Sequence, residues 1–276
     1  MFNRNLTVPD ITNFSATFYG NVSNFSYAKK EWKPHINDAL EIYVLIEGDV
    51  SFAIEGSRYD LSPGDVIITK PNEIHGCILN SNSVHNHLCF WFDTSNSFIF
   101  EPFLKHELGH NNLIRPDEES KKRLYFIYSE ILKASDKGDV HKQFYLSLEM
   151  LHILKNFTEI ENSAEAPSPI LNEIIKDMNL NFKKIHSLDY FTAKYYISPS
   201  TLNRLFKCFI KTTPKAYLET KKLSFSRMLL MQGKSVSEAA AESGFDTSAN
   251  YIRTFKRRFG ITPKQYSRNQ KKTDFI

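Results

Sequence analysis

The C-terminal part of the chain carries one helical pattern twice. Residues 248–266 read SANYIRTFKRRFGITPKQY, and residues 200–217 read STLNRLFKCFIKTTPKAY. Apolar residues, basic residues and a Thr-Pro pair follow one another in the same order in both segments. Two copies are too few for a solenoid, which needs at least three repeats. The duplication therefore indicates a small helical unit that this part of the chain uses twice.

Each copy extends further back, from Ser187 and from Ser235, and has the order short helix, tight turn, second helix. In the second copy Ser235 is a predicted N-cap, and Gly244 can take the left-handed conformation that a sharp turn requires. The alanines at 239–241 leave room for a following helix to cross closely, as in a helix-turn-helix motif. Tyr196 stands at the glycine position of the first copy, so that turn is expected to adopt another geometry.

The second helix of each unit has an apolar and a polar face. We expect one helix at about 199–209 that buries Leu202, Leu205, Phe206 and Phe209, and another at about 247–259 that buries Tyr251, Phe255 and Phe259. Amide and guanidinium groups pair with purine edges, while hydroxyl and ammonium groups bind phosphates. The residues of this kind on the two outer faces are Ser200, Thr201, Asn203, Arg204 and Lys207, and Ser248, Asn250, Arg253, Lys256 and Arg257.

A long helix is predicted between the two units. Thr213 and Pro214 form its start signal, and it ends near Gly233. Such a connector would hold two recognition helices at a fixed separation, and successive major grooves on one face of B-DNA lie about 34 Å apart. The pattern therefore predicts that one chain reads two adjacent groove segments. A plain helical bundle with a basic surface is the alternative.

Charge is distributed unevenly along the chain. Residues 1–166 contain 15 Lys and Arg against 23 Asp and Glu, whereas residues 167–276 contain 20 against 8, a net charge of +12. Such an asymmetry predicts a polyanion as partner of the C-terminal part, with double-stranded DNA as the first candidate.

The N-terminal part has the composition of a β-barrel. Between about residues 18 and 93, short β-branched and aromatic runs alternate with turns at 47–49, 55–57 and 62–65. Strands at this spacing favour an antiparallel barrel or a double-sheet jelly roll. Helical periodicity follows at about 117–133 and 139–158. These helices are too apolar to stand alone, and packing on the barrel and packing against a second chain remain equal alternatives.

The predicted fold class is therefore α+β with two domains. The first, residues 1–160, is a jelly-roll or cupin-like barrel followed by helices, and it serves as sensor and dimerisation domain. A Pro-rich linker at 161–169 leads to an all-α domain at 170–276 with two helix-turn-helix motifs joined by a linker helix. The chain has neither a run of about eighteen apolar residues nor a signal peptide, and its three cysteines form no CxxC pair. We expect a cytoplasmic protein with no membrane partner.

The second copy, SEAAAESGFDTSANYIRTFKRRFGITPKQY, resembles the C-terminal signature of AraC/XylS-type transcriptional regulators. The resemblance covers about residues 168–270. It implies a bacterial transcription factor in which the second helix of each unit reads the major groove, so that the ten outer-face residues are the DNA-binding residues. RNA polymerase would be a further partner of an activator.

The segments PHINDALEIYVLIEGDVSF and LSPGDVIITKPNEIHG resemble the small cupin barrel that many such regulators carry as a sensor. In metal-binding cupins two histidines and a glutamate on one strand meet a later histidine, and the matching positions here are His35, Asn37, Glu41 and His75. Two imidazoles and a carboxylate suit a divalent metal. Asn37 replaces one ligand, so the resemblance implies no metal and no cofactor, but a small-molecule effector.

Alternation along the strands gives a candidate effector pocket with apolar walls and a few polar groups. His85 and His87 form an HxH pair, but the loop-like NSNSVHNH around them favours exposure to solvent. The residues predicted to line the pocket are His35, Glu41, Tyr43, His75 and Trp91.

The leading prediction is a ligand-responsive, sequence-specific DNA-binding regulator that forms a homodimer and is not an enzyme. Two alternatives remain. One is a metal-dependent cupin enzyme with a DNA-binding tail, and the other is a regulator whose barrel serves only as a dimerisation scaffold.

Overall fold

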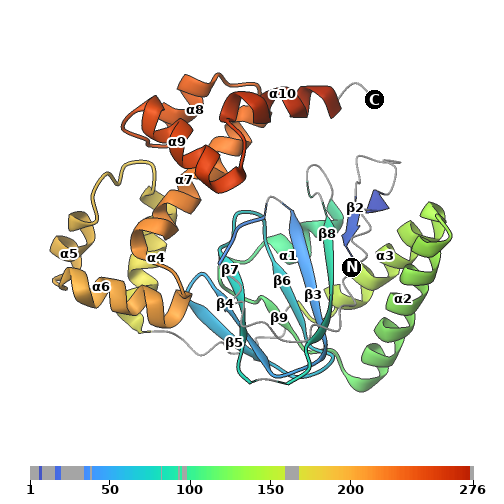
Figure 1. Ribbon diagram of the computed structural model, residues 1–276. Coiled ribbons are helices and arrows are strands. Elements are labelled where there is room, and N and C mark those ends of the chain that lie inside the picture. The colour runs from blue at the N-terminus through green and yellow to red at the C-terminus, as the bar shows by residue number, and fades with distance from the viewer. Residues whose placement is uncertain are drawn as a thin grey trace. The chain divides into compact units, whose positions relative to one another are not determined.

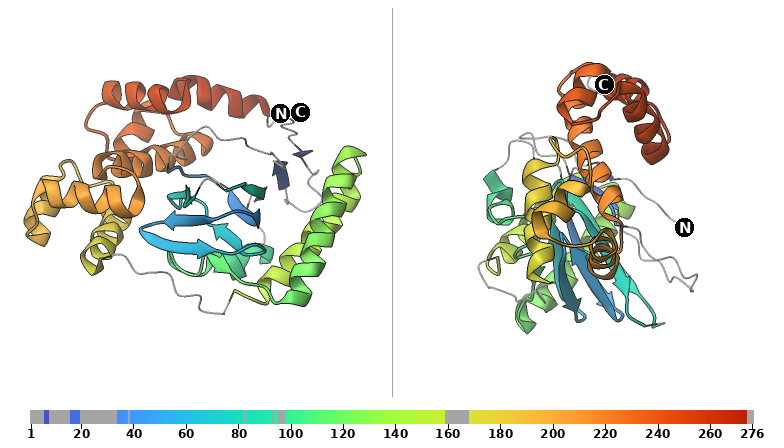
Figure 2. Two further views of the ribbon diagram at one scale, coloured as in Figure 1. Left: turned by 60° about the horizontal axis from the view of Figure 1, so that its bottom comes forward. Right: turned by 90° about the vertical axis from the view of Figure 1, so that its left-hand side faces the viewer.

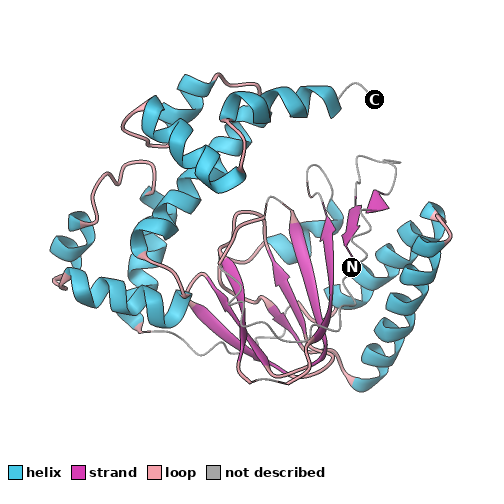
Figure 3. Ribbon diagram, in the orientation of Figure 1, coloured by secondary structure: helices cyan, strands magenta, loops and turns pink. Residues whose placement is uncertain are grey.

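The computed structural model divides the chain into two compact units, Met1–Ala166 and Pro167–Ile276. The structure describes residues 6–7, 16–19, 34–37, 39–81, 83–92, 94, 98–158 and 168–273. The described strands all belong to the first unit, and the second unit is helical (Figure 1, Figure 3). The predicted α+β class is confirmed.

The first unit contains two antiparallel sheets (Figure 1). The larger has the strand order β1 (Leu6–Thr7), β2 (Ala16–Tyr19), β8 (Asn86–Phe92), β3 (Leu40–Glu47), β6 (Val66–Thr69) and β9 (Leu113–Ile114). The smaller has the order β5 (Ser57–Leu61), β4 (Val50–Ile54) and β7 (His75–Leu79). The short strand β9 lies beyond the predicted barrel and pairs with β6.

Strand β3 is buried on both faces because its alternate side chains enter two different cores. Tyr43 and Leu45 pack with Phe52 of the smaller sheet. Ile42 and Val44 pack on the opposite face, against helices. Glu41 shares the face of Tyr43, since successive strand residues point to opposite sides. The strand thus places a carboxylate among the side chains between the two sheets.

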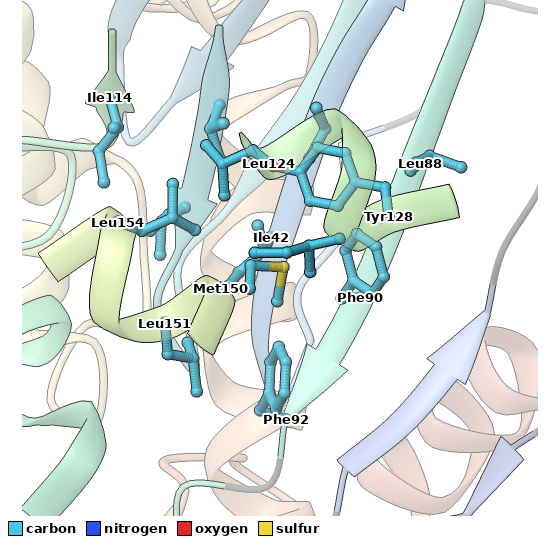
Figure 4. Packing of buried hydrophobic residues seen from close by; sticks show 14 of the residues in the cluster. Ile42, Leu88, Phe90, Phe92, Ile114, Leu124, Tyr128, Met150, Leu151 and Leu154 are labelled. Atoms are coloured by element: carbon cyan, nitrogen blue, oxygen red, sulfur yellow. The ribbon is translucent and has the colours of Figure 1, made fainter. Parts of the chain in front are cut away.

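Two helices, α2 (Glu118–Asp136) and α3 (Val140–Lys155), pack side by side on the outer face of the larger sheet (Figure 2). Leu124 and Tyr128 of α2 and Met150 of α3 meet Ile42 and Phe90 of the sheet (Figure 4). The apolar stripes of these helices are therefore covered within the chain. Two shorter helices, η1 (Phe98–Phe100) and α1 (Glu101–Leu104), precede them.

The second unit is built around one long helix, α7 (Pro214–Met231), with shorter helices at both of its ends (Figure 1). Tyr217, near its start, packs against Phe206 with ring centroids 5.5 Å apart. Leu230, near its end, packs in the core of Tyr251 and Phe255. The shorter helices are α4 (Pro169–Asn181), α5 (Asp189–Tyr195), α6 (Pro199–Leu205), the π-helical turn η2 (Phe206–Ile210), α8 (Val236–Glu242), α9 (Ser248–Phe259) and α10 (Pro263–Thr273). Among the described residues no helix has the length and apolar character of a bilayer span.

Candidate nucleic-acid interface and barrel interior

The second helix-turn-helix unit consists of α8 and α9, and a capping residue fixes the start of each helix. Ser235 and Glu238 form a capping box at the start of α8, in which each side chain accepts from the other residue's backbone N–H. Gly244 then takes φ +77, and a Cβ there would lie 2.1 Å from the Lys183 carbonyl oxygen. Thr247 caps α9 through Asn250 N. Glycine is thus favoured by the left-handed turn and required by the close approach of a neighbouring loop.

Helix α9 has one buried and one exposed face, as predicted. Tyr251 and Phe255 are fully buried. Arg253 is exposed, and its Nη2 donates to Asn250 Oδ1 (3.3 Å). Arg257 is also exposed and forms an ion pair with Glu219 of α7 (3.0 Å). The predicted residues Ser248 and Lys256 are exposed as well.

The first helix-turn-helix unit consists of α5 and α6. Ser198 caps α6 by accepting from Thr201 N. Ser200, Arg204 and Lys207 are exposed, while Thr201 and Asn203 are half-buried. The Asn203 amide donates to the Pro199 carbonyl (2.9 Å), so this side chain is held along its own helix.

Two expectations for the first helix-turn-helix unit are wrong. Tyr196 does not change the turn geometry, because it adopts φ 52, ψ 43, the same left-handed region as Gly244. Its side chain is 95% exposed and so avoids any clash. Phe209 is not buried either, because the π-helical turn at 206–210 shifts the register and brings Ile210 into the core instead.

Two apolar residues of the α9 outer face were missed from the sequence. Ala249 and Ile252 are exposed among the polar and basic groups. Their one detectable signal is spacing, since residues 249, 252, 253 and 256 recur at helical intervals along one face. Apolar side chains on a recognition helix suit thymine methyl groups.

A buried lysine of α7 holds two loops of the helical domain. Lys222 of α7 donates from Nζ to the carbonyls of Ile185 (2.8 Å) and Gly244 (2.7 Å). Ile185 lies before the first unit and Gly244 in the turn of the second. Burial lowers the pKa of Lys222. The ammonium group fixes both loops against the middle of α7.

Four of the five predicted pocket residues, His35, Glu41, His75 and Trp91, lie close together between the two sheets. His75 Nε2 lies 3.3 Å from Glu41 Oε2, and Trp91 Nε1 donates to the same oxygen (3.0 Å). Asn37 Nδ2 also donates to Glu41 Oε2. The His35 and His75 rings pack edge to face, with centroids 4.4 Å apart. Tyr43 instead contacts His85 and His87.

Burial alone would raise the pKa of Glu41, but the His75 side chain and the Trp91 indole lower it below its usual value. For His75 burial would lower the pKa, and the Glu41 carboxylate raises it. Both shifts favour a negative Glu41 next to a positive charge on or near His75.

Tyr43, His85 and His87 form a second polar group between the sheets. The Tyr43 hydroxyl lies 2.5 Å from His85 Nε2, and the His85 and His87 rings stack with centroids 4.6 Å apart. The expected exposure of the two histidines is wrong, since they retain 6% and 3% of their accessible surface. Strand β8 begins at Asn86, so His87 alternates into the interior.

The fold and the exposed helix faces define a class of protein, a DNA-binding regulator in which two helix-turn-helix units follow an antiparallel β domain in the sequence. Residues 191–269 match the model of a helix-turn-helix domain, and residues 24–92 match that of the AraC-like ligand binding domain. Together the two matches cover more than half of the chain. The chain belongs to the AraC/XylS family of transcriptional regulators.

The chain is 23% identical to the thermoregulatory protein LcrF of Yersinia pestis, over 88% of this chain and 96% of that protein. It is 22% identical to the transcriptional regulator ExsA of Pseudomonas aeruginosa, over 89% of each. Among solved structures, ToxT from Vibrio cholerae O395 matches with a TM-score of 0.40 and 12% identity, over 92% of this chain and 96% of that one. LcrF is a thermoregulatory protein and ExsA a transcriptional regulator, and this chain is a DNA-binding transcriptional regulator of the AraC/XylS family.

Proposed function

We propose that each chain reads two adjacent major-groove segments in a sequence-specific manner, with α6 and α9 as recognition helices. The observation that supports this most is that both helices lie in one compact unit, where α6 precedes α7 and α9 follows it. With 18 residues, α7 is about 27 Å long at 1.5 Å per residue. This length is comparable to the spacing of about 34 Å between successive major grooves.

The side chains of the two faces would divide between bases and phosphates. Arg253 and Asn250 already contact each other, and amide and guanidinium groups together suit a purine edge. Arg257 is exposed and would exchange its ion pair with Glu219 for a phosphate oxygen when DNA binds. Lys207 in η2 and Lys256 in the last turn of α9 are exposed and fit phosphates.

Hydroxyl-radical footprinting of the full-length protein on a bound duplex tests this proposal. We expect two protected patches per chain on one face of the DNA, about 10 base pairs apart, and an affinity that falls steeply with salt. A single patch per chain would contradict two-groove reading, and an affinity independent of salt would contradict the role of the basic unit.

We propose that the barrel responds to a small-molecule effector and has no enzymatic role, and that the protein acts in the cytoplasm, where its DNA is found. The five predicted pocket residues are polar or aromatic groups among apolar side chains, a composition that is usual for ligand pockets. They are His35, Glu41, Tyr43, His75 and Trp91. Thermal unfolding against a panel of sugars and organic acids tests this. A ligand at a hundred times its Kd adds about 2.7 kcal/mol of stability. A panel without any effect would favour the scaffold alternative.

A homodimer through α2 and α3 is also proposed, because their outer faces keep aromatic residues in solvent. Phe126 of α2 and Tyr145 of α3 are 51% and 64% exposed, and Tyr125, next to Phe126 in the chain, is 37% exposed. Light scattering should show a dimer that Phe126→Glu dissociates and that Tyr196→Glu, at an exposed aromatic of the other unit, leaves intact. Equal effects of both changes would place the interface elsewhere. RNA polymerase would be a further partner if the protein activates transcription.

A further inference from the structure

Three side chains with metal-ligating atoms converge inside the barrel. One ligand atom each of His35, Glu41 and His75 lies within 4.8 Å of the others. His35 and His75 are paired by two backbone hydrogen bonds, of 2.9 and 3.0 Å. Glu41 reaches them from β3 of the other sheet. The three groups are therefore held by the fold before any ligand binds.

The hydrogen bonds of His75 show that a cation belongs in this cluster. Nδ1 lies 2.9 Å from the Glu73 carbonyl, which can only accept, so Nδ1 carries the proton. Nε2 then faces Glu41 Oε2 at 3.3 Å, yet it makes no hydrogen bond of acceptable geometry, and the side chain is 1% exposed. A lone pair and a carboxylate would repel each other across this gap. A proton or a metal ion between them removes the conflict.

The surroundings resemble the outer shell of a metal site. Ligating histidines generally donate their other ring nitrogen to a carbonyl or carboxylate, as His75 does to Glu73. Ligating carboxylates are themselves hydrogen-bonded, as Glu41 is by Trp91 and Asn37. Two imidazole nitrogens and one carboxylate oxygen suit zinc, iron, cobalt or nickel better than magnesium or calcium.

We propose that His35, Glu41 and His75 bind one divalent transition-metal ion and leave its remaining coordination positions open. Asn37, whose amide donates to Glu41, lies beside the three ligands without being a fourth. In the sequence, the absence of a histidine at position 37 argued against a metal site. The structure shows that the other three groups nevertheless meet in a geometry that can hold one.

Full-length protein stripped with EDTA and titrated with Co²⁺ and Zn²⁺ tests the site. We expect one equivalent per chain by mass spectrometry after desalting, a visible Co²⁺ absorption band, and a higher unfolding temperature with Zn²⁺. Outer-shell changes usually cost 10–100-fold in affinity, so Glu41→Gln and His35→Gln should each cost at least about 100-fold. His152→Gln, at an exposed histidine of α3, is the matched control and should change nothing.

A gain of affinity provides an independent test. Asn37→His adds a fourth ligand, and we expect at least about tenfold tighter binding with a shifted Co²⁺ spectrum. The proposal is overturned if the wild-type protein binds no ion, since a proton then occupies the gap. It is also overturned if Glu41→Gln, His35→Gln and Asn37→His leave the affinity unchanged. None of these measurements uses DNA, so their failure would leave the proposed groove reading untouched.

Discussion

Gly244 and Tyr196 occupy equivalent turns and show what a single residue contributes. Both adopt left-handed backbone angles, with φ 77 and φ 52. This conformation costs a non-glycine residue about 1–2 kcal/mol. Tyr196 bears only that cost because its side chain extends into solvent. At Gly244 a side chain would also collide with the backbone of Lys183.

Gly244→Ala should therefore destabilise the helical unit much more than Gly233→Ala. Gly233 has φ +84 but nothing within 4 Å of an added Cβ, so its substitution should cost about 1 kcal/mol. The Gly244 variant adds a contact of 2.1 Å to the same backbone cost, and we expect at least about 3 kcal/mol. Urea unfolding followed by far-ultraviolet circular dichroism measures both. Equal costs would show that the Lys183 loop moves freely.

Ile252 is predicted to contact a thymine methyl group. It is 38% exposed in the outer face of α9 next to Arg253. Replacing single thymines of a bound duplex by deoxyuridine removes only the methyl group. At one position the replacement should weaken DNA binding by the wild-type protein by about 1 kcal/mol, the scale of one lost methyl contact. The same replacement should leave DNA binding by the Ile252→Ala variant unchanged. If deoxyuridine weakens both proteins equally, Ile252 does not read that methyl group.

Among the elements, those with strong periodicity were predictable and those set by local backbone chemistry were not. Strand β3 was indicated by its continuous β-branched and aromatic run, and helix α2 by the three-to-four-residue spacing of its apolar residues. Strand β9 has only two residues, too few for any period, and is defined by its pairing with β6. The π-helical turn after α6 inserts a residue into the helical register, which no apolar pattern indicates.

The buried His87 of β8 predicts a dependence of stability on pH. Burial and the neighbouring His85 lower the pKa of His87 to about 4. The unfolded chain takes up this proton near pH 6.5, so the folded barrel loses stability as the pH falls from about 6.5 to about 4. The slope should reach about 1.4 kcal/mol per pH unit relative to His87→Phe, which keeps the ring stacked on Tyr43. Parallel pH profiles of both proteins would show that His87 is protonated in the folded state.

Helix α7 acts as more than a spacer because its Lys222 holds the loop at Ile185 and the turn at Gly244. Lys222→Met keeps most of the buried chain length but leaves the Ile185 and Gly244 carbonyls without this donor. We expect a loss of about 1–3 kcal/mol. Lys234→Met removes an exposed ion pair with Glu242 and should cost less than about 1 kcal/mol. Similar losses in urea unfolding would show that Lys222 does not hold the loops.

For the whole molecule, the sequence predicted the roles of the two domains better than the details of either site. The uneven charge and the duplicated unit indicated DNA binding, and periodicity placed polar residues such as Arg204 and Arg253 on exposed faces. The burial of His85 and His87 was missed because their neighbours Asn82, Ser83 and Asn86 are typical of loops. Their partner Tyr43 lies in β3, and a contact over that sequence distance has no local signature.

The central claim is that each recognition helix reads its own block of DNA. Selection of bound sequences from random duplexes tests it most directly, with the full-length wild-type protein, Arg204→Ala and Arg253→Ala at one stated salt concentration. We expect two enriched blocks about one helical turn apart, with one variant relaxing the first block and the other the second. A single enriched block, or the same block relaxed by both variants, would contradict the claim.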